Sequence, residues 1–176
     1  MPGGRVGNAV LVEDEGSLTK FLLSVHVIAA IIAIGPVAVA ASMFPVAART
    51  ALSSPGDNRA VAVLRTLHRI CRVYAVVGVV VPVFGIATAV SLGVLTDAWL
   101  IVSMTLTAIA AALLIMVLLP IQDTLLTQVG VEPPSAAADT TTALTRRLAM
   151  TTGMFNLLWA TVTVLMIVRP GSTTGV

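Results

Sequence analysis

Four long apolar stretches dominate the chain, at residues of about 20–47, 73–93, 98–119 and 145–168. A stretch of about 18 or more apolar residues without charge is typical of a membrane-spanning helix, because about 20 residues cross the hydrocarbon core of a bilayer. Strands of a membrane barrel would alternate polar and apolar positions, and these stretches do not. The pattern therefore predicts an all-α, membrane-embedded four-helix bundle with up-down topology.

Polar segments and prolines set the expected boundaries within the chain. Residues 1–19 are predicted to form a polar N-terminal tail that ends at an N-cap, Ser17, and residues 170–176 a C-terminal tail. Residues 20–169 then form a single four-span domain. Pro36 and Pro82 lie near the middle of the first two spans and predict kinks there, and Pro120 is expected to end the third span.

The first apolar run also has an alternative interpretation, a cleavable signal peptide, because "AVAA" at 38–41 resembles a cleavage site. The leader before it carries three acidic residues, and the apolar run is longer than the usual 7–15 residues. Both features favour a retained first span.

Composition agrees with a membrane location, since the chain is 57% hydrophobic and only 10% charged, whereas soluble domains have about 25% charged residues. The net charge is only +2, and the arginines gather at the expected membrane boundary. Arg65, Arg69 and Arg72 fall at i, i+4 and i+7 on one helical face, so they are predicted to contact lipid headgroups. Lipids explain this charge better than nucleic acid does.

Charge asymmetry predicts the orientation of a multi-pass protein in the cell membrane. Loops one and three share a side and hold seven of the ten basic residues, whereas the other side holds three. The seven are Arg49, Arg59, Arg65, Arg69, Arg72, Arg146 and Arg147, and the three are Arg5, Lys20 and Arg169. The positive-inside rule therefore places loops one and three in the cytoplasm and both termini outside.

His26 is the one ionisable side chain within the first apolar run. It shares a helical face with small residues such as Ala29 and Ala33, which favours a position inside the bundle. One interpretation is a neutral imidazole bonded to a hydroxyl at similar depth, for which the candidates are Thr88, Thr105 and Thr161. The other is a haem ligand paired with Met104, which lies at similar depth in the third span.

The second histidine, His68, precedes the second span and lies at the opposite membrane face, some 25 Å from His26 across a core of about 30 Å. The two histidines therefore cannot bind one iron, and His68 is expected to be an interfacial residue among arginines. Cys71 nearby is expected to be an interfacial thiol, with palmitoylation as the alternative.

The fourth span is the most polar, and its Asn156 lies near mid-membrane, where an amide needs a hydrogen-bonding partner. Thr152, one turn earlier, is the expected local partner, so the pair is predicted to be a buried polar group that supports helix packing. A substrate contact is the alternative.

Lys20, Arg146 and Arg147 lie at the ends of their spans, and no Asp, Glu, Lys or Arg lies deeper in any span, which disfavours an ion pump or a coupled transporter. The sequence also lacks a phosphate-binding glycine loop, CxxC, HExxH and a nucleophile elbow, so no catalytic residue or metal site is predicted and an enzyme is not favoured.

The residues leave two hypotheses for the function. The first is a non-catalytic subunit or accessory protein that contacts lipids and either a protein partner or a second copy. The second is a b-type haem protein or haem-linked oxidoreductase that uses His26.

The run "HVIAAIIAIG" at 26–35 resembles the first helix of a group of small bacterial four-helix membrane proteins. This group includes uncharacterised integral membrane families, copper-resistance-D-like proteins and the membrane-bound protoporphyrinogen oxidase of haem synthesis. The resemblance implies a haem-associated role for His26, as in the oxidase. Its likeness to copper-resistance proteins implies a third hypothesis, a metal or small-molecule transport component.

Overall fold

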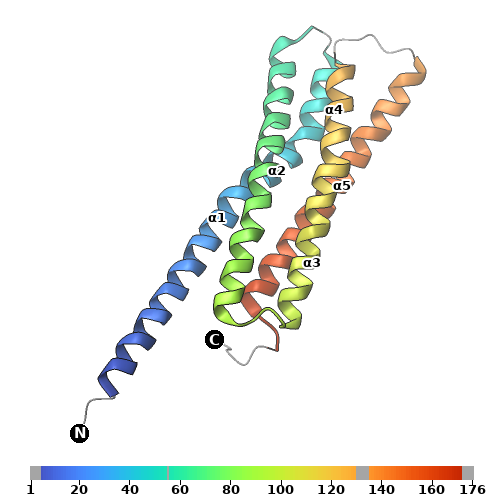
Figure 1. Cartoon of the computed structure of the whole chain (residues 1–176). Coiled ribbons are helices and arrows are strands. Elements are labelled where there is room, and N and C mark those ends of the chain that lie inside the picture. Colours follow the sequence, from blue (N-terminus) through green and yellow to red (C-terminus); the bar gives the residue numbers. More distant parts are fainter. Residues whose placement is uncertain (1–4, 55, 130–134, 172–176) are drawn as a thin grey trace.

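The computed structural model describes residues 5–54, 56–129 and 135–171, and within these ranges every regular element is helical. The elements are α1 (Arg5–Ser53), α2 (Asn58–Leu92), α3 (Ala98–Leu113), a π-helical segment (Leu114–Leu118), α4 (Leu119–Gln128) and α5 (Ser135–Val168). The π-helical segment joins α3 to α4 without a break, so these three elements form one continuous rod (Figure 1).

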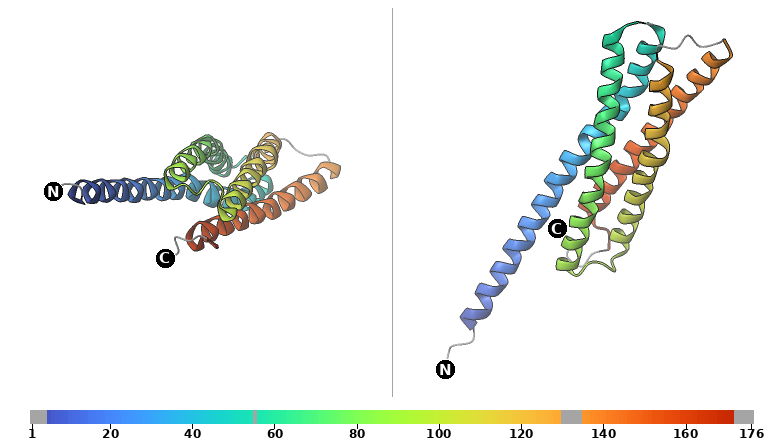
Figure 2. Two further views of the ribbon diagram at one scale, coloured as in Figure 1. Left: turned by 60° about the horizontal axis from the view of Figure 1, so that its bottom comes forward. Right: turned by 45° about the horizontal axis from the view of Figure 1, so that its top comes forward.

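Consecutive rods run in opposite directions, and α1 crosses α2 while α5 runs at a similar tilt to α1 (Figure 1). The N-terminal part of α1 leans away from the other helices in all three views (Figures 1 and 2). Contacts of α1 are most extensive with α2, whereas α3 packs mainly against α5. The bundle is therefore closed at one end and splayed at the other.

Four helical stretches have the length and apolarity of membrane spans: Lys20–Ser53, Asn58–Val90, Ala98–Gln128 and Asp139–Val168. The predicted all-α four-helix membrane fold is thus confirmed, and the four stretches fit a multi-pass membrane protein. Each has at least 30 residues, more than the about 20 that a bilayer requires. The helices therefore continue past the hydrocarbon core.

A charge-free band marks the part of the bundle that fits the hydrocarbon core. On α5 it covers residues 148–168, which at 1.5 Å per residue is about 30 Å, the thickness of that core. Arg49, Arg72, Asp123 and Arg147 border the band at the end that carries the α1–α2 connection. We call this the arginine end.

The main hydrophobic core lies toward the arginine end and draws residues from α1, α2, α5 and the α3–α4 rod. Its largest fully buried apolar side chains are Phe44, Leu64, Leu118, Leu125, Leu148 and Phe155. A smaller cluster of Ala89, Trp99 and Leu100 lies at the opposite end. Residues 20–32 of α1 contribute no buried side chain to either cluster.

The helices extend beyond the predicted spans, because helix continues where polar residues were expected to interrupt it. The first helix begins at Arg5, so Ser17 lies inside α1 and does not cap it. The connection after α1 is short, since α2 starts at Asn58. The Asp57 carboxylate caps α2 by accepting hydrogen bonds from the backbone amides of Arg59 (2.9 Å) and Ala60 (3.3 Å).

Pro120 does not end the third span, contrary to expectation. Proline lacks an N–H, and its ring clashes with the carbonyl four residues earlier in a regular α-helix. The wider π-helical turn at Leu114–Leu118 lies directly before Pro120 and provides the room that the ring needs. Pro36 and Pro82 also lie inside continuous helices, and the kinks predicted at them stay predictions.

Candidate functional site

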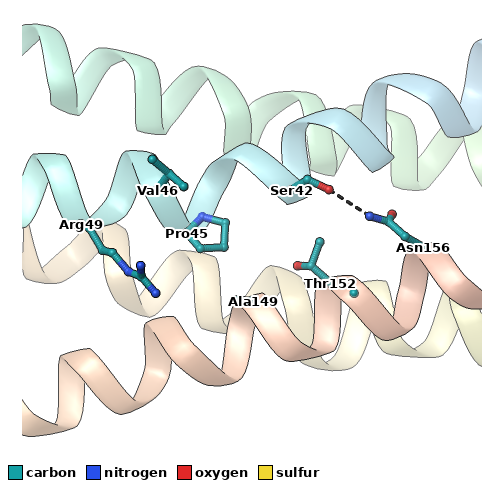
Figure 3. A pocket seen from close by; sticks show the side chains of 8 residues that line it. Ser42, Pro45, Val46, Arg49, Ala149, Thr152 and Asn156 are labelled. Atoms are coloured by element: carbon teal, nitrogen blue, oxygen red, sulfur yellow. Dashed lines mark hydrogen bonds between the residues drawn. The ribbon is translucent and has the colours of Figure 1, made fainter.

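A pocket of about 290 Å³ lies between α1 and α5 (Figure 3). Four residues of each helix line it: Ser42, Pro45, Val46 and Arg49 from α1, and Ala149, Thr152, Gly153 and Asn156 from α5. The spacing places each set on one helical face. The small residues Ala149 and Gly153 leave the space that larger side chains would fill.

Asn156 and Ser42 form the polar floor of this pocket. Asn156 Nδ2 donates to Ser42 Oγ at 2.9 Å, and Ser42 Oγ donates to the backbone carbonyl of Ala38 at 2.6 Å. The partner of Asn156 is therefore on α1, and the local partner expected from the sequence, Thr152, does not bond to it.

Two polar atoms of the pocket are buried without a hydrogen bond, Thr152 Oγ1 and Asn156 Oδ1. Thr152 is only 3% exposed, and its side chain lies in the space between the two helices (Figure 3). Leaving such a group unpaired costs about 1–3 kcal/mol. A bound ligand with complementary groups would remove this cost.

Arg49 lies at the arginine end of the pocket, and its guanidinium extends from α1 toward α5 (Figure 3). It has no ion pair or hydrogen bond with any residue in the described ranges. Arg146 lies one turn before Ala149 on the pocket-lining face of α5. The pocket thus combines an unpaired cation at one end with unpaired polar atoms deeper in the membrane band.

His26 lies on α1 against α2 at the splayed end. A Cβ atom placed on Gly85 would lie 3.0 Å from His26 Cε1, so the absence of a side chain at Gly85 admits the imidazole. His26 Nδ1 is buried and has no hydrogen bond. Of the hydroxyls considered as partners, those of Thr105 and Thr161 donate to carbonyls of their own helices instead.

Met104 and His26 do not lie on helices that pack extensively against each other. It is on α3, its side chain is 39% exposed, and α1 packs against α2, α5 and α4. The two residues lie at similar depth, as expected, because α2 and α3 are joined by a short turn at the end where His26 contacts Gly85.

His68, expected to be an interfacial residue among arginines, is buried at the arginine end. Its Nδ1 is 3.0 Å from Gln122 Oε1 on α4, and Gln122 Nε2 donates to Cys71 Sγ at 3.6 Å. His68 Nε2 lies 3.1 Å from Asp123 Oδ1, outside the alignment of a hydrogen bond. We call His68, Cys71, Gln122 and Asp123 the α2–α4 clasp. Its two residues on α2 lie about fifty residues from its two residues on α4, so the sequence did not indicate that they meet.

The three arginines predicted to bind headgroups do not behave alike. Arg65 and Arg69 are exposed, as headgroup contacts require. Arg72 is exposed as well, and its Nη2 also lies 3.3 Å from Asp123 Oδ1 and 3.4 Å from Oδ2, so it bridges α2 to α4. Cys71 is fully buried, which leaves no surface for palmitoylation.

Within the described ranges no three His, Cys, Asp or Glu side chains gather as metal ligands would. Comparison with known proteins finds no family model, no curated protein and no solved structure that matches this chain. The function is therefore inferred from the geometry of the helices.

Proposed function

We propose that this protein is a non-catalytic membrane subunit or accessory protein that contacts a protein partner, or a second copy, through residues 20–32 of α1. We call these residues the α1 arm. Its position supports the proposal, because the arm contacts α2 at Gly85 through His26 and exposes Phe21, Ile28 and Ile31, while α1 leans away from the other helices toward its N-terminus (Figures 1 and 2). Lipid tails can cover its apolar side chains.

The observation that favours protein over lipid is His26 on this arm, whose imidazole has no hydrogen bond to a described residue; its Nδ1 is enclosed by the chain, so a partner would reach the ring at Nε2. Polar side chains in a bilayer face protein or a cavity, because lipid tails offer no hydrogen bond. A neighbouring helix with a hydroxyl or amide group can form the hydrogen bond that lipid tails cannot. The positive-inside rule places the arginine end in the cytoplasm, so the arm would lie in the outer half of the membrane.

Photocrosslinking in native membranes tests this function. With a benzophenone amino acid at Ile31, which is 67% exposed on the arm, we expect a discrete protein adduct on a denaturing gel. The matched control is Met116, which is 75% exposed on the α3–α4 rod and should yield no protein adduct. Co-expression of two differently tagged copies shows whether the captured protein is a second copy. Equal labelling at both positions, or none at Ile31, would contradict the proposal.

The second candidate is a b-type haem protein, and His26 supports it in part. Its imidazole has no hydrogen bond to a described residue, as a free axial ligand would, but that imidazole itself fills the space left by Gly85. The expected second ligand does not fit, since Met104 is partly exposed on a helix that does not pack along α1. If His26 alone holds haem, the purified protein should show a Soret band that disappears in His26→Ala and persists in Met104→Leu. A colourless wild-type protein after expression with added haem precursor would rule out this candidate.

A further inference from the structure

We propose that the pocket between α1 and α5 binds the phosphate and glycerol-ester region of an anionic phospholipid. This inference concerns a different part of the molecule from the α1 arm and does not depend on the subunit role. It rests on the depth of the pocket, on its unpaired polar groups and on its size.

The depth of the pocket matches the headgroup region of a bilayer. Arg49 and Arg147 both border the charge-free band, so the guanidinium of Arg49 lies at the level of lipid phosphates. Ser42 lies seven residues earlier on α1, about 10 Å deeper at 1.5 Å per residue. The pocket therefore extends from the phosphate level into the region of the ester groups and upper acyl chains.

From the membrane surface inward, the unpaired groups of the pocket match first the phosphate and then the ester groups of a phospholipid. A guanidinium binds a phosphate through charge-assisted hydrogen bonds, and Arg49 has no competing partner among the described residues. Deeper in the pocket, the buried hydroxyl of Thr152 can donate to an ester carbonyl. Asn156 Oδ1 needs a donor that an ester lacks, and a water bonded to the ester supplies it.

The size of the pocket limits how much of the lipid it encloses. A volume of about 290 Å³ is at the lower end for small-molecule sites, enough for the phosphate and glycerol but not for two acyl chains. The chains would lie on exposed apolar side chains such as Val46 and Met150. Arg146 and Arg147 add positive charge at the same end, which disfavours a cationic choline and favours an anionic headgroup.

Trp159 provides a reporter, because it lies one turn beyond Asn156 on the same face of α5. Of the two tryptophans, Trp99 lies at the opposite end, so Trp99→Phe leaves a single fluorophore. The protein in phosphatidylcholine vesicles is titrated with brominated phosphatidylglycerol or brominated phosphatidylcholine. We expect phosphatidylglycerol to quench Trp159 at a lower mole fraction, and Arg49→Gln to reduce this preference about tenfold.

Two further variants separate specific binding from surface charge. Arg65→Gln removes an exposed arginine of the same end, on α2 and outside the pocket, and should leave the preference unchanged. Thr152→Val should weaken both lipids equally, because both carry the same esters, and Thr152→Ser should restore binding. Circular dichroism and gel filtration confirm that each variant is folded.

Three results would overturn the inference. One is equal quenching by both lipids in the protein with Arg49 intact. Another is an equal loss of preference in Arg65→Gln and Arg49→Gln, which would indicate a general effect of surface charge. The third is displacement of phosphatidylglycerol by inorganic phosphate at equal concentration, which would indicate a soluble anion as the ligand.

Discussion

Replacing Phe44 by alanine should lower the free energy of unfolding in detergent micelles by about 3–5 kcal/mol, the usual loss when a buried phenylalanine is truncated. Phe44 is 0% exposed and belongs to the main core with Leu64 and Leu118. Its ring fills the region where α1 meets the rest of the bundle, so truncation leaves a cavity that rigid neighbouring helices cannot close. Denaturant titration followed by circular dichroism measures the change.

The neighbouring residue provides a matched control for this prediction. Met43 is 53% exposed on the outer face of α1, so Met43→Ala should change the free energy of unfolding by less than about 1 kcal/mol. Similar losses for the two variants would show that α1 does not pack through Phe44, and the arrangement of α1 in the bundle would then be wrong.

The second large effect is expected at the α2–α4 clasp. Gln122→Leu removes the acceptor of His68 and the donor to Cys71, and we expect it to destabilise the protein by about 1–3 kcal/mol. Most of this loss comes from leaving the imidazole nitrogen buried and unpaired. The double variant His68→Leu with Gln122→Leu replaces both partners by apolar groups, so it should recover much of the lost stability.

The residue beside Gln122 distinguishes a buried contact from an exposed one. Asp123→Asn weakens the exposed ion pair with Arg72 and should cost less than about 1 kcal/mol. A double variant as unstable as the sum of its two single variants would show that His68 and Gln122 do not act as a pair. Thermal unfolding of all four variants in one detergent gives the comparison.

The spans could be predicted from the sequence because the transfer of apolar side chains into lipid depends on local composition alone. The residues 98–119 and 145–168 illustrate this, since both lie inside the observed helical stretches. The ends of the helices were harder to predict from the sequence. Pro120 stops a regular helix, and nothing in a single sequence announces the π-helical turn that accommodates it.

The candidate sites were predictable only in part, because they arise where helices distant in sequence meet. Asn156 was identified as a polar residue that needs a partner, but Ser42 lies more than a hundred residues away. Arg49 was counted only as a charge that sets orientation. His68 was expected at the membrane interface, but its contact with Gln122 of another helix was not predicted. Such pairings are set by the crossing of whole helices and leave no local pattern.

The π-helical segment also fixes the rotational phase of α4 relative to α3. A π turn contains about one residue more than an α turn, and one residue corresponds to a rotation of about 100° around the helix axis. Regular α geometry with every residue kept would rotate the following segment by that angle, whereas deletion of one residue from Leu114–Leu118 would restore α geometry and keep the observed phase. Without the π turn, Gln122 would point away from His68, so this turn determines whether the amide meets the imidazole.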